Sequence, residues 1–191
     1  YAKSLGVEPF TTVGDFKTLD WVEKLKPKIY KISSGLNTHI PLIKKIASLN
    51  KTVIISTGTA NEAETQEAVH SFTQLGNKSL ILMHCVSSYP TPFDQTNLSL
   101  IKLLNSKYPF PIGYSDHALG YQAVLASIAL GSIVIEKHFT LDINRKSFDH
   151  KISLDAKNFK EMIENIKLLK SMLGNKIQWV SNLESKNKKW M

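Results

Sequence analysis

The sequence predicts a (β/α)₈ TIM barrel, of which this chain carries strands three to eight. Short runs rich in β-branched and apolar residues alternate with longer segments of helical periodicity, and no β-hairpin signal separates them. Polar residues follow each predicted strand. In barrel enzymes the active site is built at that face from the carboxyl ends of several strands, so these two observations together indicate the barrel.

An open doubly wound sheet is the competing architecture, because it shows the same alternation of strands and helices. No Gly-x-Gly-x-x-Gly fingerprint follows the first predicted strand, which argues against a dinucleotide-binding sheet. The polar strand ends therefore favour the barrel. Six β–α units cannot close an eight-stranded barrel, so we expect two further units before Tyr1.

The first half of the chain contains three predicted strands, each followed or preceded by a helix. Apolar residues recur at helical spacing from Phe16 onward, and Pro41 is a favourable first-turn residue for the second helix. The third strand is continuously apolar, as a parallel strand covered on both faces should be. The predicted elements are strands at 7–12, 29–33 and 52–57, and helices at 16–25, 41–49 and 62–75.

The second half repeats this pattern three times. The fifth helix is rich in alanine and ends at Gly131, and the last is long, amphipathic and ends at Gly174. The predicted elements are strands at 79–85, 111–114 and 133–138, and helices at 98–104, 121–130 and 155–173.

Composition bounds the class of protein. With 191 residues, 42% of them hydrophobic and 21% charged, the chain suits a single globular domain. No apolar run approaches the roughly 20 residues needed to span a bilayer, so we expect no membrane segment. The single cysteine, Cys85, has no internal partner for a disulfide, which indicates a reducing cytoplasm.

The formal charge of +8 raises the question of a nucleic-acid partner. Nearly all of it is lysine, with Arg145 the only arginine, and the lysines are spread over predicted helix faces. Arginine is the residue favoured for bidentate contacts to phosphate or guanine. We therefore expect a solvated basic surface and no nucleic-acid binding.

Two histidines, His117 and His138, stand at the ends of consecutive predicted strands. Neighbouring strands lie about 4.8 Å apart, so the two imidazoles can share one ion and leave positions open for water or substrate. Asp116 and Asp149 lie nearby as carboxylates that can either ligate the ion or hold its ligands in place. The alternative is that each histidine is a hydrogen-bonded structural residue.

Hydroxyl groups also gather at the strand ends, at Thr12, Ser34, Ser56 and Ser115. Such an array can hold a phosphate, and Lys31 on the second strand can supply the positive charge. The alternative is that serine and threonine simply end strands, as they do in many proteins.

Because side chains alternate between the two sides of a strand, the sequence also predicts the side on which Glu136 and Cys85 lie. Glu136 faces the same side as His138, and we expect an interior ion pair from it rather than a catalytic base. Cys85 follows His84 and faces the opposite side, so the two cannot form a nucleophile–base pair, and we expect Cys85 to pack in the core.

Five segments resemble the successive motifs of the sialic acid synthase family, which includes legionaminic and pseudaminic acid synthases and spore-coat polysaccharide relatives. The resemblance runs in the same order from Tyr1 to about Leu173. The segments are 31–35 (KISSG), 55–58 (ISTG), 84–92 (HCVSSYPTP), 113–117 (GYSDH) and 136–140 (EKHFT).

The resemblance implies a metal-dependent condensation of phosphoenolpyruvate with an N-acetylated amino sugar of the N-acetylmannosamine type. His117 and His138 match the ligands of the divalent metal, Mn²⁺ or else Mg²⁺ or Co²⁺. Tyr89 and Asp149 match contacts to the amino sugar. The implied phosphoenolpyruvate site consists of Thr12, Lys31, Ser34, Ser56, Ser87 and Ser115.

The same resemblance implies a division of the chain into a partial barrel at 1–175 and a linker at 176–191. The linker would lead to a C-terminal antifreeze-like domain that the chain lacks, and relatives of this kind form homodimers. We expect the segment alone to be inactive. Leu36 stands where the family usually has a glutamate that touches the sugar, Val13-Gly14 where it has Pro-aromatic, and Ser147-Phe148 where it has Gly-Pro.

Two alternatives to the synthase stay open on the sequence. The first, motivated by Leu36, is a barrel of the same family that is catalytically inactive. The second is another synthase that condenses phosphoenolpyruvate with an aldose.

Overall fold

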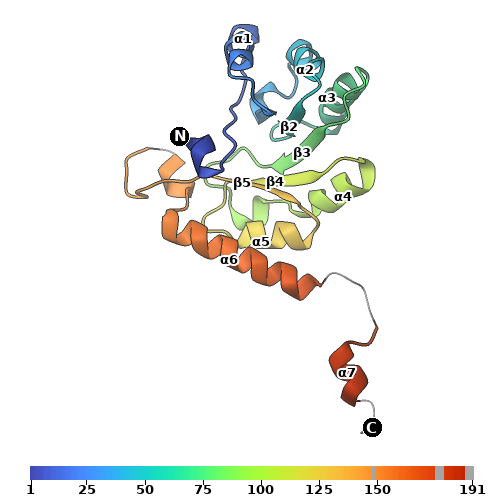
Figure 1. Ribbon diagram of the computed structural model, residues 1–191, viewed down its shortest axis with the longest axis vertical. Coiled ribbons are helices and arrows are strands. Elements are labelled where there is room, and N and C mark those ends of the chain that lie inside the picture. The colour runs from blue at the N-terminus through green and yellow to red at the C-terminus, as the bar shows by residue number, and fades with distance from the viewer. Residues whose placement is uncertain (148, 175–178, 188–191) are drawn as a thin grey trace.

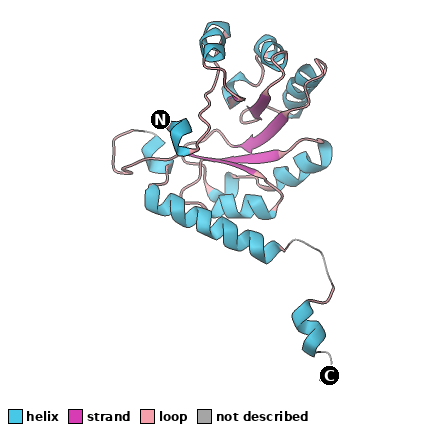
Figure 2. Ribbon diagram, viewed as in Figure 1, coloured by secondary structure: helices cyan, strands magenta, loops and turns pink. Residues whose placement is uncertain are grey.

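One parallel β-sheet forms the centre of the computed structural model, which describes residues 1–147, 149–174 and 179–187. Its strands pair in sequence order, and each pair is parallel. The sheet curls along this order into a half-barrel (Figure 2). The five strands are β1 (Ile29–Ile32), β2 (Thr52–Ser56), β3 (Leu80–Cys85), β4 (Ile112–Asp116) and β5 (Val134–Lys137).

The helices surround the outside of this sheet (Figure 1). One helix precedes β1 and one follows each strand, which is the right-handed β–α order expected of a barrel. They are α1 (Phe16–Lys24), α2 (Ile40–Ala47), α3 (Glu62–Thr73), α4 (Ser99–Lys107), α5 (Gln122–Ala129) and α6 (Ala156–Leu173). These bounds agree with the predicted helices within a few residues at each end.

Local sequence signals explain where the helices begin. Asn61 caps α3 by accepting from the Glu64 backbone N–H, and the Glu64 carboxylate accepts from the Asn61 backbone N–H, which completes a capping box. Asp15 caps α1 through the Thr18 N–H, and Asp155 caps α6 in the same way.

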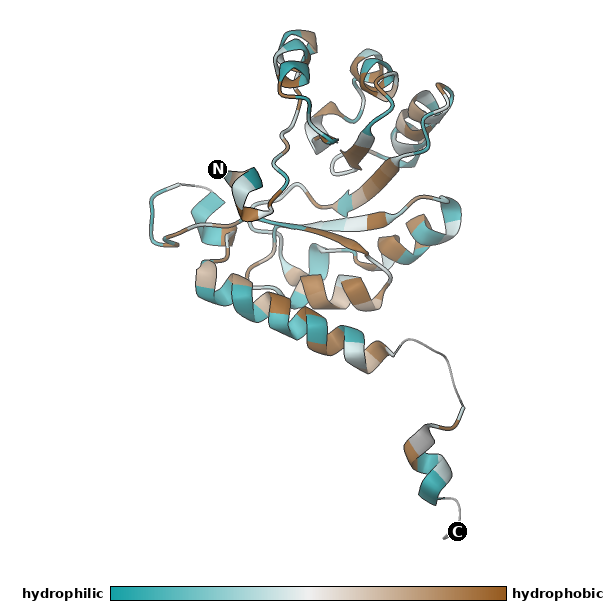
Figure 3. Ribbon diagram, viewed as in Figure 1, coloured by the Kyte–Doolittle hydropathy of each residue, from teal (hydrophilic) through white to brown (hydrophobic). Residues whose placement is uncertain are grey.

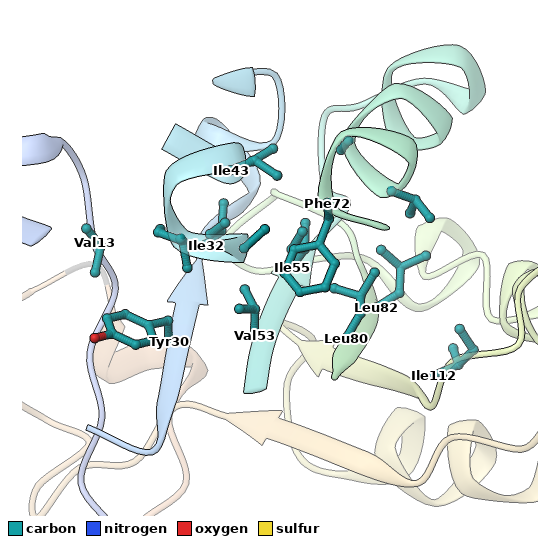
Figure 4. Packing of buried hydrophobic residues seen from close by; sticks show 14 of the residues in the cluster. Val13, Tyr30, Ile32, Ile43, Val53, Ile55, Phe72, Leu80, Leu82 and Ile112 are labelled. Atoms are coloured by element: carbon teal, nitrogen blue, oxygen red, sulfur yellow. The ribbon is translucent and has the colours of Figure 1, made fainter. Parts of the chain in front are cut away.

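The hydrophobic core lies between the sheet and the helices. Figure 3 shows hydrophobic residues concentrated along the strands and on the helix sides that face them. The strand side chains that point outward alternate with those that point inward, as the period of two requires. Those in the core cluster include Tyr30, Ile32, Val53, Ile55, Leu80, Leu82 and Ile112, packed with Ile43 of α2 and Phe72 of α3 (Figure 4).

The first predicted strand, at 7–12, is wrong except at its end. Thr12 forms a single isolated parallel bridge to Lys31, supported by the Val13 N–H on the Lys31 carbonyl at 3.1 Å. Pro9 has no N–H to donate to a ladder, and Val7 and Phe10 are exposed, so the segment has no apolar face to bury. Within the described residues the chain therefore forms five paired strands where the sequence predicted six.

Beyond α6 the chain forms one more short helix, α7 (Asn182–Asn187), on which Leu183 is 74% exposed. The predicted boundary between barrel and linker at 175–176 lies outside the described residues, so that division stays a prediction. In the part of the chain that the structure describes, no helix has the length and apolar character needed to cross a membrane.

Candidate active site

A cavity of about 540 Å³ opens at the carboxyl ends of the strands. Its volume lies in the range typical of small-molecule sites. All the predicted site residues except Asp149 line it, namely Thr12, Lys31, Ser34, Ser56, Ser87, Tyr89, Ser115, His117 and His138. Asp149 is exposed at the start of the short 3₁₀ helix η4 (Asp149–Ile152), outside the lining.

Lys31 is the centre of a polar network inside the curl of the sheet. It is only 6% exposed, and its Nζ donates to Ser56 Oγ at 2.8 Å. The same Nζ lies 3.4 Å from Glu136 Oε2, and Ser115 Oγ donates to the other carboxylate oxygen at 2.7 Å. The interior ion pair predicted for Glu136 is thus confirmed, and the network joins β1, β2, β4 and β5.

Three short side chains converge at Gly58, beside this network. Ser34 Oγ lies 2.9 Å from Cys85 Sγ, and a Cβ added at Gly58 would lie 2.7 Å from each of these two atoms and 2.4 Å from Ser87 Oγ. Only glycine lets them approach so closely. Cys85 is buried, as predicted, but it also lines the cavity, which the sequence did not indicate because a lone cysteine carries no pattern.

The two histidines meet at the other end of the cavity. Their ring centroids lie 5.4 Å apart, and the Tyr89 ring packs against His117 at 4.2 Å and against His138 at 6.0 Å. His117 is buried, and its Nδ1 lies 2.9 Å from the Val86 carbonyl oxygen. Because a carbonyl only accepts, this contact assigns the proton to Nδ1 and leaves the Nε2 lone pair free.

The electrostatics of this site suit metal binding by histidine. Burial lowers the pKa of His117, with the neighbouring His138 adding to the effect, so the neutral imidazole that ligates metals is favoured. Among residues 1–147, 149–174 and 179–187, no three His, Cys, Asp or Glu side chains are grouped so as to hold an ion. The pair fits a divalent metal that completes its coordination with water or substrate oxygens.

Directly before each histidine stands a member of a buried ion pair. Lys137 Nζ lies 2.8 Å from Asp116 Oδ2, and the two side chains are 1% and 0% exposed. Asp116 is therefore engaged on the helix side of the sheet, which rules out the metal-ligand role considered for it from the sequence. Sequence reasoning missed this pair, although both members precede a predicted ligand on consecutive strands.

Leu36 ends the 3₁₀ helix η2 (Ser34–Leu36), half-buried against the main core and outside the cavity lining. An apolar residue therefore suits its surroundings.

A second cavity, of about 470 Å³, lies between α3 and α4 and is mostly apolar, with Leu100, Leu103 and Leu104 in its wall. It touches Cys85 and Ser87 from the helix side but contains neither histidine of the pair nor Lys31. Because the buried Lys31 with its partner Glu136 and the adjacent histidine pair line the first cavity, we take that one as the candidate active site.

Comparisons with known proteins show the family to which this chain belongs. The family model described as "NeuB family" matches residues 1–178. The chain is 40% identical to N,N'-diacetyllegionaminic acid synthase of Campylobacter jejuni, over 98% of this chain and 57% of that protein. It is 37% identical to N-acetylneuraminate-9-phosphate synthase of Drosophila melanogaster, over 88% of this chain and 46% of that protein.

Among solved structures, the N-acetylneuraminic acid synthetase of Leptospira borgpetersenii in complex with citrate superposes with a TM-score of 0.93 at 33% identity. That match covers 99% of this chain and 66% of the other. The chain spans about half the length of the curated relatives it matches.

Proposed function

Because this chain belongs to the NeuB family, we propose that it forms most of the condensing barrel of a sialic acid-type synthase. The reaction joins phosphoenolpyruvate to an N-acetylated amino sugar and releases phosphate. One observation carries the proposal: a buried lysine, several hydroxyl groups and two adjacent histidines line a single cavity at the strand ends. Such a set can bind a phosphorylated carboxylate beside a metal-bound aldehyde.

Phosphoenolpyruvate binds at the lysine end of the cavity. Lys31 donates one hydrogen to Ser56, and its charge is only partly neutralised by Glu136 at 3.4 Å, so it attracts the phosphate. Ser56 accepts that hydrogen and keeps its own hydroxyl hydrogen to donate. The other anion-binding groups are Thr12, Ser34, Ser87 and Ser115.

The amino sugar binds at the histidine end, in its open-chain form. His117 and His138 would hold Mn²⁺, or Mg²⁺ or Co²⁺ in its place, and the ion supplies Lewis-acid polarisation of the sugar aldehyde. Tyr89 packs against both imidazole rings and closes this end of the cavity. In our proposal Tyr89 and Asp149 contact the amino sugar, with Asp149 at the start of η4 outside the cavity lining.

The reaction balances without a redox partner. The C3 carbon of phosphoenolpyruvate attacks the aldehyde carbon, and its double-bond electrons form the new C–C bond. Water adds at C2, and its two hydrogens supply the proton on the new alcohol and the proton released as phosphate leaves. Cleavage of the C2–O bond then gives the 2-keto acid and inorganic phosphate.

The complete enzyme extends beyond this segment in our proposal. Two further β–α units would close the eight-stranded barrel together with the five paired strands and the segment that Thr12 joins to β1. A C-terminal antifreeze-like domain would meet the partner barrel in a homodimer. In the part that the structure describes, no full strand pairs with the outer edges of β1 and β5, which have only the isolated bridges of Thr12 to Lys31 and of Phe139 to Leu154 beside them. Unpaired edges of this kind favour aggregation, so we expect no activity from the isolated segment.

Phosphate release by the intact protein tests the proposal. With phosphoenolpyruvate, Mn²⁺ and N-acetylmannosamine, we expect release that depends on both sugar and metal and that His117→Ala abolishes. His70→Ala, an exposed histidine on α3, is the matched control and should retain activity. No release with any of a panel of N-acetylated amino sugars would refute the proposal, and release only with simple aldoses would indicate the other phosphoenolpyruvate–aldose class.

The inactive barrel is not favoured by an observation in the structure. It was motivated by Leu36, and that side chain packs on the core instead of facing the cavity.

A further inference from the structure

The ion pair formed by Asp116 and Lys137 is the most deeply buried one between described residues. Each of the other ion pairs between described residues has at least one side chain that is more than a quarter exposed, whereas these two are withdrawn from water. Taking two charges out of water costs more than a single contact repays, so such a pair persists only where further hydrogen bonds complete it.

Those hydrogen bonds are present. Asp116 Oδ1 accepts from the Tyr114 hydroxyl at 3.1 Å and from the Ala118 backbone N–H at 3.0 Å. Lys137 Nζ donates to Asp116 Oδ2 at 2.8 Å and to the Ala118 carbonyl at 2.6 Å. Burial raises the pKa of Tyr114, and the Asp116 charge adds to it, so the phenol keeps the proton that it donates.

These hydrogen bonds lie at the ends of β4 and β5, directly beside the two histidines. Asp116 and Lys137 are direct partners in the β4–β5 ladder, and they are the last pair in it. His117 and His138 are the next residue of each strand, and their rings face the cavity. The pair holds the Ala118 N–H and the Ala118 carbonyl, which fixes the backbone immediately after His117, and the β4–β5 ladder fixes it immediately before.

We propose that Asp116 and Lys137 are positioning residues, whose buried ion pair fixes the ends of β4 and β5 so that His117 and His138 hold one divalent metal. This inference rests on the proposed function for the metal site and for the identity of its ion. The charged groups of the pair bind each other, Tyr114 and the Ala118 backbone, so the pair would act through the backbone and not by contact with substrate or metal. Its effect is to limit the separation and orientation of the two imidazoles, on which chelation by only two protein ligands depends.

If the pair only stabilised the fold, metal affinity would recover together with the melting temperature once the buried charge is removed. A charge-neutral double variant tests this. Lys137→Met leaves a buried carboxylate without its cation, and we expect the melting temperature to fall by about 10 °C. Adding Asp116→Asn removes the stranded charge, and the amide oxygen can still accept from Tyr114 and Ala118. The double variant should therefore recover most of the melting temperature.

Metal affinity should not recover with it. We expect the double variant of the intact protein to bind Mn²⁺ about tenfold more weakly than the unmodified protein, as measured by electron paramagnetic resonance of free Mn²⁺. Lys107→Met breaks the exposed pair with Glu62 and should leave the affinity unchanged. Wild-type affinity in the double variant, or equal weakening by Lys107→Met, would overturn the proposal. If the double variant fails to fold, the isosteric single variant Asp116→Asn takes its place. Wild-type Mn²⁺ affinity in that variant would likewise overturn the proposal.

A second readout needs no metal. In protein labelled with ¹⁵N-histidine, we expect one sharp set of ring signals for His117 and His138 in the unmodified protein, and broadened or split signals in the double variant. Sharp single signals in both would overturn the positioning role. An unmodified protein that binds no Mn²⁺ would contradict the metal site of the proposed function, while the ring signals would still decide on the pair.

Discussion

The outer face of the sheet, which the helices cover, is built from apolar side chains, whereas the inner face carries charges and hydroxyl groups toward its carboxyl end. Both faces come from the same strands, one residue apart. The outer set includes Tyr30, Ile32, Val53, Ile55, Leu80, Leu82 and Ile112. The inner set includes Lys31, Ser56, Cys85, Ser115 and Glu136.

This difference assigns stability and chemistry to separate faces. The outer side chains are almost all completely buried and lose water on folding, which is the dominant favourable contribution to stability. The inner groups line an open cavity, where Glu136 keeps a side-chain exposure of 41%. Substitutions of the apolar outer side chains should therefore change stability with little effect on ligand binding, and substitutions on the inner face should do the reverse. The Asp116–Lys137 pair is the exception on the outer face, because it borders the two histidines.

The largest expected effect is on the outer face. Leu82 is completely buried, so Leu82→Ala should lower the free energy of unfolding by about 3 kcal/mol through lost burial and the cavity it leaves. Urea unfolding of the intact protein measures this. Leu103→Ala, at a side chain that is 54% exposed, is the control and should change stability by under about 0.5 kcal/mol. Equal losses from the two variants would contradict the assignment of the core.

On the inner face, Lys31→Met should lower kcat/KM for phosphate release about 100-fold, which corresponds to about 2.7 kcal/mol. The cause is loss of the charge that binds the substrate phosphate. Stability should change by under about 1 kcal/mol, because Glu136 is partly exposed and can take up water. Lys28→Met removes an exposed lysine paired with Glu8 and should leave activity intact. A large loss of stability without loss of activity would show that Lys31 serves the fold and not substrate binding.

A smaller effect is expected at Gly58, beside which three residues of the cavity lining converge. Gly58→Ala would force Ser34, Cys85 and Ser87 to turn aside, and we expect about a tenfold loss of kcat/KM, or about 1.4 kcal/mol. The steady-state assay should show this with a nearly unchanged melting temperature. Gly14→Ala, where an added Cβ meets nothing within 4 Å, is the matched control. Full activity in Gly58→Ala would show that the close approach is unimportant.

The smallest effect concerns His84, a polar exception on the outer face. Burial lowers its pKa, and its Nε2 donates to the Thr96 carbonyl at 2.8 Å. The unfolded chain therefore takes up a proton below about pH 6.5 while the folded protein resists it, so stability should fall as the pH drops from 7 toward 5. His84→Gln should make this fall shallower in thermal melts at a series of pH values. An identical slope in both proteins would show that His84 makes no contribution.

Much of this arrangement could be predicted from the sequence because both faces follow the same period of two. Lys31, Ser56 and the two histidines could be placed at strand ends from the alternation alone, without knowledge of how the strands pair. The strand at 7–12 failed because pairing depends on a neighbour and on Pro9, which local apolar content does not report.

Contacts across the sheet were harder to predict. The Asp116–Lys137 pair depends on the relative register of two strands, which the sequence does not state. The approach of Ser34 to Cys85 depends on the absence of a side chain at Gly58. Asp149 lies outside the cavity because η4 sets its position, and no periodicity describes a single turn of this kind.

The contact between Lys31 and Glu136 has a consequence for how the site is acquired during folding. It joins the first and the last strand of the sheet order, so it can form only after every strand between them has docked. Contacts between residues far apart in sequence carry a large loop-closure cost and form slowly. The apolar pairing of β2 with β3 can precede this step, whereas a chain arrested before β5 docks would be partly folded and would still lack the charge balance of its anion-binding pocket.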